Sequence, residues 1–276
     1  MNKMQVSRKD VAAAFRAAGC IDADTVIFHS SLKSMGYVEG GAVAVYNGIL
    51  DAVGINGTVA VPSLWYNGKP QERKKEDFDV KSSPAYNGTI PEALRLDPRA
   101  YRSDNFSHAV CAIGARAAEL TGNHGKGKLY PAPWGDEAFA EISPWSKLYE
   151  WNALYCFIGV DMNTCTIKHY IESRFVEDML QKLPPEKYDD FRRELAHDCC
   201  GSILPWAYYP GIKMRSELEA RNLITKVKLG SAEVMALRTR PLVDTTTEIL
   251  RSAPQEWFTT DFCSWMQRVN TAANHS

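Results

Sequence analysis

A histidine and a glutamate stand three residues apart in the segment TIKHYIESRF, at His169 and Glu172. Residues with this spacing lie on one face of a helix, so the imidazole and the carboxylate can meet. Such a pair can be a general base with its orienting carboxylate, two ligands of a metal ion, or an ordinary helix surface. Spacing alone favours the ordinary surface, because histidine and glutamate often fall in this register by chance.

A metal site would require at least one further ligand and an open coordination position. The candidates are His108, His124, His197 and many carboxylates, but none shows a recognisable ligand spacing. The seven cysteines form no C-x-x-C pair, so we expect reduced, mostly buried thiols in a cytoplasmic protein. We therefore expect no bound metal.

A general base at this position has a definite structural requirement. Glu172 would hold the imidazole of His169 in one tautomer and stabilise the imidazolium that forms when the ring accepts a proton. The ring must also face a cleft. Open α/β sheets bind ligands at the carboxyl ends of their strands, and the apolar run ALYCFIGV, a predicted strand, ends just before this helix.

Other segments predict the sheet and the helices that would form such a cleft. DTVIFHSSL, GTVAVPSL and HAVCAIG are further apolar runs typical of buried strands. Helices are predicted after Ser7, across AVAVYNGILDAVG, across ISPWSKLYEW and from His169 through Leu180. Strand, turn, helix and strand in this order imply a right-handed crossover. The fold class is therefore α/β, a layered α/β/α arrangement with a central, mostly parallel or mixed sheet.

The C-terminal third is less regular. A hairpin is predicted to turn at Gly230 and Ser231, followed by a helix from Asp244. We interpret residues 1–276 as a single domain, with a smaller subdomain from about residue 180 as an alternative and a C-terminal extension from about 252. Aromatic side chains of this extension either pack on the domain or form a subunit contact, so a homodimer is one expectation. They are Trp257, Phe262 and Trp265.

Bulk composition argues against some partners. The formal charge of −1 favours neither a nucleic acid nor an acidic membrane surface as a partner. No apolar run reaches the roughly 18 residues that a bilayer-spanning helix requires, and the first residues are too charged for a secretory signal. We expect a cytoplasmic protein that binds small molecules.

Five motifs occur in the order that one known family shows. They are VIFHSSLKSMGYVEGG with the following helix and strand, SSPAYNGTIPEALR, RSDNFSHAVCAIG, ISPWSKLYEW and TIKHYIE. In this respect the chain resembles the aminoglycoside 3-N-acetyltransferase family over about residues 7 to 250. That family has the antibiotic N-acetyltransferase fold, which is distinct from the GNAT fold. Each motif is weak by itself, whereas five in order are specific.

The resemblance implies an enzyme, a CoA-dependent N-acyltransferase. It would transfer an acetyl group from acetyl-CoA, the co-substrate, to a primary amine of an amino sugar by direct transfer in a ternary complex. His169 would be the general base, with Glu172 beside it. Cys165 could suggest an acyl-enzyme, but the family pattern does not require it. The resemblance places CoA against Ser31, Ser34, Gly36, Gly40, Gly41, Arg102, Ser103 and His108.

Several of these assignments have a simpler alternative. The glycines between Gly36 and Gly41 open a helix, where backbone amides can bind a pyrophosphate, yet a tight turn would also explain them. Arg102 could face a phosphate or cap a strand end. His29 and His108 flank predicted strands, where a histidine is more often a core residue than a catalytic one.

Two departures from the family pattern bear on the acceptor. Asn105 and Phe106 replace the usual His-Pro, which bears on either the acceptor pocket or the approach of CoA. The loop after Pro62 is basic, and its positive charge would repel a polycationic drug and suit an anionic acceptor such as a nucleotide-linked amino sugar. The cations are Lys69, Arg73, Lys74 and Lys75.

Three functions therefore stay open at the level of sequence. The first is acetyl transfer to an amino sugar, either in biosynthesis or in aminoglycoside resistance. The second is a metal-dependent hydrolase built on His169, Glu172 and His108. The third is a CoA-binding or interaction protein without catalysis.

Overall fold

A seven-stranded mixed sheet forms the centre of the molecule, in the order β5-β6-β4-β2-β7-β9-β8. The computed structural model describes residues 5–65, 75–195 and 205–274. Strands β4, β2 and β7 are parallel, and the antiparallel strands β6 and β9 flank them. The predicted α/β class with a parallel or mixed sheet is confirmed. The strands are β2 (Thr25–Ser30), β4 (Thr58–Pro62), β5 (Tyr101–Arg102), β6 (Val110–Gly114), β7 (Leu154–Ile158), β8 (Thr225–Leu229) and β9 (Ala232–Arg238).

Successive side chains of β2 show why the sheet is covered on both sides. Val26 and Phe28 belong to one hydrophobic cluster, whereas Ile27 between them belongs to another. Neighbouring residues of a strand point to opposite faces. All three are fully buried, so the continuous apolar run in the sequence reflects a strand between two helical layers.

The first helical layer consists of α1 (Arg8–Ala17), α2 (Gly41–Val53) and α3 (Thr89–Arg95). Ser7 caps α1 as the sequence predicts, in a reciprocal capping box with Asp10. A small parallel pair, β1 (Gln5–Val6) and β3 (Tyr37–Val38), lies beside this layer. Short 3-10 turns are found at Leu32–Met35, Lys75–Asp77 and Met162–Thr164.

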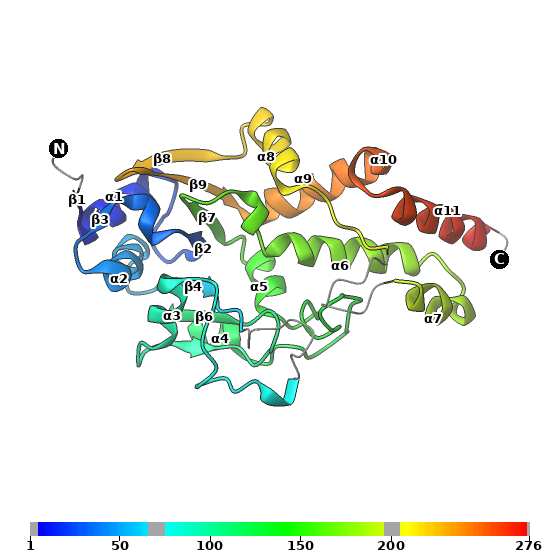
Figure 1. Ribbon diagram of the computed structural model, residues 1–276, viewed down its shortest axis with the longest axis horizontal. Helices are drawn as coiled ribbons and strands as arrows, with labels where there is room; N and C mark the ends of the chain where they lie inside the picture. Colours follow the sequence, from blue (N-terminus) through cyan, green and yellow to red (C-terminus); the bar gives the residue numbers. More distant parts are fainter. Residues whose placement is uncertain (1–4, 66–74, 196–204, 275–276) are drawn as a thin grey trace.

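The second layer covers the other face and continues beyond the sheet (Figure 1). Its long helix α6 (Ile167–Leu180) starts after β7 and runs away from the sheet toward the end of the molecule that carries α11 (Figure 1). The remaining helices are α4 (Ala117–Thr121), α5 (Pro144–Glu150), α7 (Pro185–Arg193), α8 (Gly211–Ala220), α9 (Thr239–Ser252), α10 (Pro254–Trp257) and α11 (Thr260–Asn274). Within the described residues, no helix has the length and apolarity needed to cross a bilayer.

Two features of the C-terminal third differ from the sequence prediction or resolve its alternatives. Helix α9 begins at Thr239 and not at Asp244, because Pro241 lies in its first turn, where proline needs no hydrogen-bond donor. The β8–β9 hairpin joins the central sheet through β7. The hairpin therefore contributes to the same sheet as the first half of the chain, as the single-domain interpretation requires.

The aromatic residues after residue 252 pack on this chain itself. Phe262 and Trp265 are fully buried and stack with ring centroids 5.3 Å apart. Phe262 and Phe258 also contact Phe175 of α6. Of the two alternatives for the extension, packing against the domain is the one observed.

Candidate active site

The predicted pair meets on α6. His169 Nδ1 lies 2.7 Å from Glu172 Oε2, which is the distance of a strong charge-assisted hydrogen bond. The Glu172 side chain is completely buried, whereas that of His169 is 22% exposed. Because Nδ1 donates to the carboxylate, Nε2 carries the free electron pair and is available to accept a proton.

Helix α6 is attached to the sheet directly before this pair. The hydroxyl of Tyr155 on β7 accepts hydrogen bonds from the backbone N–H groups of Thr166 and Ile167, at 3.1 and 3.3 Å. The same hydroxyl lies 2.8 Å from His29 Nε2 at the end of β2. Since the Tyr155 oxygen accepts two amides, its proton goes to Nε2, and burial lowers the pKa of His29 to about 3. His29 is thus a neutral ring that helps to fix the start of α6.

An aromatic box surrounds the His169 imidazole and leaves it partly exposed. Trp134 lies nearest, with ring centroids 4.2 Å apart, and His108, Phe139 and Tyr208 lie within 6.4 Å. Ser173, one turn after His169, donates a 2.7 Å hydrogen bond to the carbonyl of Pro131. This bond holds the loop that carries Trp134 against α6.

The segment before α8 closes the other side. Trp206 is buried and donates its indole N–H to Glu172 Oε2 at 3.3 Å. Tyr208 follows and contacts both Trp134 and His169. Trp134, Trp206 and Tyr208 were not identified from the sequence, because loop residues far apart in the chain carry no spacing signal. Ser173 of α6 was also missed, because a lone serine within a helix carries no functional signal.

Asn105, which stands where the family pattern has histidine, has a local structural role. Its Oδ1 accepts hydrogen bonds from the backbone N–H groups of Ser107 and His108, at 3.2 and 2.7 Å. This turn presents His108 to the box, where its ring centroid lies 5.8 Å from that of His169. His108 is therefore the one predicted cofactor residue that the structure brings against the predicted base. Within the ranges that the structure describes, no three His, Cys, Asp or Glu side chains are grouped as metal ligands.

A cavity of about 280 Å³ opens at the carboxyl ends of β2, β4 and β7. Thr166, at the start of α6, is part of its wall, and His169 follows one helical turn later. Thr166 and His169 are thus about 5 Å apart along the helix axis, and His169 itself is not among the residues that line the cavity. Its lining is Phe28, His29, Ser30, Leu64, Asn87, Pro91, Val160, Thr164 and Thr166.

The loop after β2 carries five of the predicted cofactor residues. Ser34 Oγ donates to the carbonyl of Ser31 at 2.7 Å, so the two serines stabilise their own turn. Gly36, Gly40 and Gly41 all have positive φ, and Gly40 and Gly41 form the start of α2. These backbone angles agree with the tight-turn explanation of the three glycines. Their contact with a pyrophosphate stays a prediction.

Arg102 and Ser103 form hydrogen bonds inside the protein. The guanidinium of Arg102 donates to the carbonyls of Ser83 and Ser63, and burial lowers its pKa to about 10. Ser103 is fully buried, and its Oγ accepts from the backbone N–H of Val110 and contacts His124 Nδ1 at 2.9 Å. Both residues hold loops that flank the cavity, and their contact with CoA stays a prediction.

Other sequence predictions can be placed more briefly. Cys165 is buried, and burial raises the pKa of its thiol to about 12, which disfavours a nucleophilic thiolate. Lys75 forms an ion pair with Glu137 at 2.7 Å, so its charge is matched. Lys69, Arg73, Lys74 and His197 lie outside the described residues.

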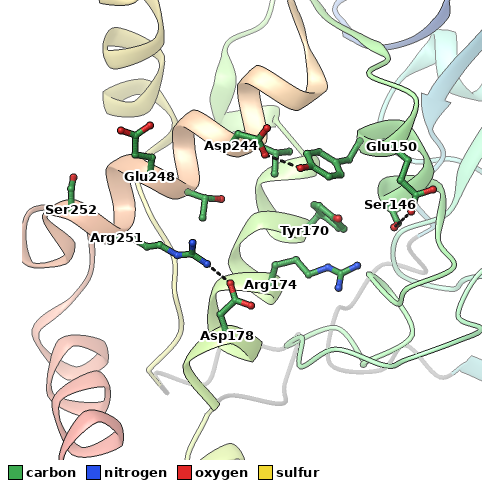
Figure 2. A pocket seen from close by; sticks show the side chains of 12 residues that line it. Ser146, Glu150, Tyr170, Arg174, Asp178, Asp244, Glu248, Arg251 and Ser252 are labelled. Atoms are coloured by element: carbon green, nitrogen blue, oxygen red, sulfur yellow. Dashed lines mark hydrogen bonds and ion pairs between the residues drawn. The ribbon is translucent and has the colours of Figure 1, made fainter. Parts of the chain in front are cut away.

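A larger groove of about 850 Å³ lies between α5, α6 and α9. Figure 2 shows its side chains, among them Arg251 paired with Asp178. The hydroxyl of Tyr149 donates a 2.8 Å hydrogen bond to Asp244. Its residues on α6 are spaced four apart, from Tyr170 through Asp178, and do not include His169 or Glu172. The groove is therefore separate from the His169 site.

Comparison with known proteins identifies relatives. The family model described as aminoglycoside 3-N-acetyltransferase matches residues 27–251. Aminoglycoside N(3)-acetyltransferase VII of Streptomyces paromomycinus is 29% identical over 208 residues, covering 70% of this chain and 67% of that protein. Aminoglycoside N(3)-acetyltransferase IX of Micromonospora chalcea is 31% identical over 183 residues, covering 61% of this chain and 62% of the relative. The chain thus matches about two thirds of the length of these relatives.

Solved structures share the fold. The complex of AAC-IIIb with CoASH superimposes with a TM-score of 0.69 at 20% identity, covering 93% of this chain and 98% of that one. The YokD protein from Bacillus subtilis gives a TM-score of 0.67 at 22% identity, with 89% and 93% coverage. The fold predicted from the five motifs is confirmed.

Proposed function

Because the chain belongs to the aminoglycoside 3-N-acetyltransferase family, we propose that it transfers an acetyl group from acetyl-CoA to a primary amine of an aminoglycoside or related amino sugar. The observation that carries the proposal is the 2.7 Å contact of His169 with Glu172, on a helix that starts at the cavity. The family consists of N-acetyltransferases, which is the enzyme class that the sequence predicts.

The dyad suits the chemistry of amide formation. An ammonium group is not a nucleophile, so a proton must leave the amine before or while nitrogen attacks the thioester carbonyl. His169 Nε2 accepts this proton, and Glu172 holds the ring and stabilises the imidazolium. Trp134, with its ring 4.2 Å away, limits the water around the ring.

The reaction balances without any further reactant. The amine nitrogen forms a bond to the acetyl carbon, and the bond from that carbon to sulfur breaks. An ammonium nitrogen loses two protons on the way to the amide. His169 passes one of them to the departing thiolate and the other is released to solvent, giving the amide and free CoA. No acyl-enzyme is required, in agreement with the buried, protonated thiol of Cys165.

We propose that the reactive end of the donor occupies the cavity at the strand ends. Its volume of about 280 Å³ is close to the lower limit of small-ligand pockets, which suits the acetylated end of the pantetheine arm but not a whole CoA. The rest of CoA would lie outside it, toward the loop that carries Ser31, Ser34 and Gly36. A solved protein of the same fold is bound to CoASH, which supports this donor.

The acceptor has two candidate classes. Names of relatives favour an aminoglycoside, and one solved protein of this fold is in complex with a gentamicin. A nucleotide-linked amino sugar is the second candidate, suggested by the basic run before Lys75. The pairing of Lys75 with Glu137 weakens that argument at the one cation of the run that the structure describes.

Thiol release from acetyl-CoA, measured with a panel of amines, tests the function. The panel should contain several aminoglycosides and several nucleotide-linked amino sugars, and the products should be confirmed by their added acetyl mass. Turnover that depends on an amine and is lost in His169→Gln supports the proposal. Acetyl transfer that persists at the wild-type rate in His169→Gln would require another base.

Two further outcomes would favour the other classes. Hydrolysis that stops after dialysis against a chelator, without amine-dependent CoA release, would indicate a metal-dependent hydrolase. Binding of CoA without turnover of any amine in the panel would indicate a binding protein.

A further inference from the structure

The buried carboxylate of Glu172 has unequal surroundings at its two oxygens. Oε2 accepts from His169 Nδ1 at 2.7 Å and from Trp206 Nε1 at 3.3 Å. Oε1 is buried and has no hydrogen-bond partner among the residues that the structure describes. A buried anion without compensation is costly, so the group that compensates Oε1 matters for the charge of the whole dyad.

Lys168 supplies that compensation. Its Nζ lies 3.7 Å from Glu172 Oε1, too far for a hydrogen bond but within ion-pair distance. Among the described residues it is the only lysine or arginine whose charged nitrogen lies within 4.0 Å of this carboxylate. The Lys168 side chain is only 15% exposed, so water screens the interaction weakly.

The position of Lys168 is itself fixed from outside α6. Its Nζ donates a 2.8 Å hydrogen bond to the carbonyl of Tyr209 and lies 5.1 Å from the centroid of the Tyr209 ring. Tyr209 belongs to the same segment as Trp206, which contacts the other carboxylate oxygen. One segment thus supplies Trp206 at Oε2 and holds Lys168 near Oε1.

Removal of this positive charge would change which group of the dyad holds a proton. A buried carboxylate needs one nearby cation, and without Lys168 the imidazolium form of His169 would become that cation. A base that is already protonated cannot accept a proton from the amine. With Lys168 present, the positive charge of the lysine offsets the negative charge of Glu172. The imidazole of His169 can then stay neutral.

We propose that Lys168 is a positioning residue that keeps Glu172 ionised beside a neutral His169, and so sets the pH above which the enzyme works. This inference rests on the function proposed above and extends it to Lys168, a residue of the TIKHYIE motif to which the family resemblance assigns no role. It predicts that the charges of Lys168, Glu172 and His169 depend on one another.

Other groups that face the dyad do not replace Lys168 in this role. Burial raises the pKa of Cys165 to about 12 and that of Tyr209 well above its usual value, so both stay neutral. Trp134, Trp206, Phe139 and Tyr208 carry no charge near neutral pH. His108 is the remaining titratable ring among the described neighbours, at 5.8 Å between centroids.

The pH dependence of kcat/KM in Lys168→Met tests the proposal, because methionine keeps the length and loses the charge. A charge at this distance shifts the pKa of a neighbouring group by about one to three units. We expect the acidic limb of the profile to move up by about one unit, so activity falls by up to about tenfold on that limb and changes little on the plateau above it. Lys168→Arg should restore the wild-type limb. Lys182→Met, just beyond the far end of α6, is the matched control and should leave the profile unchanged.

A second measurement does not depend on turnover. Titration of ¹³C-labelled histidines by NMR follows the His169 ring directly, with its signal assigned by its loss in His169→Gln. In Lys168→Met the midpoint of this signal should rise by about one unit. Lys168→Gln retains a neutral donor for the Tyr209 carbonyl and should shift in the same direction, which separates the charge from the loss of a hydrogen bond.

The outcomes distinguish the two proposals. Suppose that the wild type acetylates an amine, but that Lys168→Met moves neither the acidic limb of kcat/KM nor the NMR midpoint of His169. The role of Lys168 is then refuted and the proposed function stands. If no amine is turned over, the proposed function fails, and the NMR midpoint alone decides whether Lys168 controls the charge of His169. Lys168→Met and Lys168→Gln should keep the circular dichroism of the wild type, and if one unfolds the other supplies the result.

Discussion

At the scale of single residues, the site depends on the protonation of one ring. His169 is partly exposed and contacts a fully buried carboxylate, whereas the neighbouring His29 is held neutral by burial. Two histidines at one sheet edge therefore have different roles. In the proposed mechanism His169 exchanges a proton with the substrate, whereas His29 supports the helix on which His169 stands.

Replacement of the base should reduce catalysis without unfolding the protein. We expect His169→Gln to lower kcat by about 10²- to 10⁴-fold, the usual contribution of a placed general base. The melting temperature should stay near that of the wild type, because the ring is 22% exposed. Steady-state thiol release and a thermal melt on the same preparation measure both. A loss of less than about tenfold in kcat would contradict the assignment.

His29 should not contribute a step to the pH profile of activity. Burial holds its pKa at about 3, below the working range of the enzyme. His29→Asn should therefore lower activity at all pH values alike and leave the midpoint of the acidic limb in place. A moved midpoint would show that His29 and not His169 titrates in that limb.

At the scale of elements, the box around His169 is made by two loops that α6 holds in position. Ser173 binds the carbonyl of Pro131, and Trp206 binds Glu172. Residues 131–140 and 205–210, which make these contacts, form no helix or strand of their own. Their attachment to one helix explains how residues from three separate parts of the chain keep a constant distance from the base.

Loss of the Ser173 hydroxyl should loosen the loop that carries Trp134. Ser173 is fully buried, so Ser173→Ala leaves the Pro131 carbonyl without this partner, at a cost of about 1 kcal/mol in the free energy of unfolding. We expect a several-fold lower kcat/KM for the amine together with this destabilisation. Urea unfolding and steady-state kinetics measure the two effects, and an unchanged kcat/KM would separate the loop from catalysis.

At the scale of the whole molecule, the C-terminal helices belong to the folded core. Trp265 is fully buried, stacks on Phe262 and donates its indole N–H to the carbonyl of Phe191. The helix α11 that carries it packs against α6, the helix of the dyad. The far end of α6 therefore depends on residues close to the end of the described chain.

Truncation of that tryptophan should destabilise the protein. Trp265→Ala is expected to cost about 3–5 kcal/mol, the usual range for a buried aromatic replaced by alanine. Guanidinium unfolding measures this change, and Trp151→Ala, at a less buried tryptophan, gives the comparison. A cost below about 1 kcal/mol would show that α11 is dispensable for folding.

Buried histidines should make stability depend on pH. Burial lowers the pKa of His124 to about 4, so the folded state keeps it neutral while the unfolded chain protonates near pH 6.5. Its contribution is complete above pH 6.5 and is lost as pH falls toward 4, by up to about 1.4 kcal/mol per pH unit. His124→Gln should reduce the slope of unfolding free energy against pH in that window. An unchanged slope would assign the dependence to other groups.

The sequence predicted much of the fold because its signals are local. The cap at Ser7, the apolar run of β2 and the helix after β7 each depend on a few neighbouring residues. The start of α9 lies five residues before the predicted one, because Pro241 occupies the first turn of the helix and does not interrupt it. The family followed from five motifs in order.

The sequence by itself determined the α/β fold, the family and the pair His169 and Glu172, since repeat period, motif order and helical spacing are properties of adjacent residues. Only the tertiary structure decided what surrounds that pair. Trp134 and Trp206 reach the dyad from a loop and from a distant segment. Distances between such residues depend on how the elements pack, and no spacing along the chain encodes them.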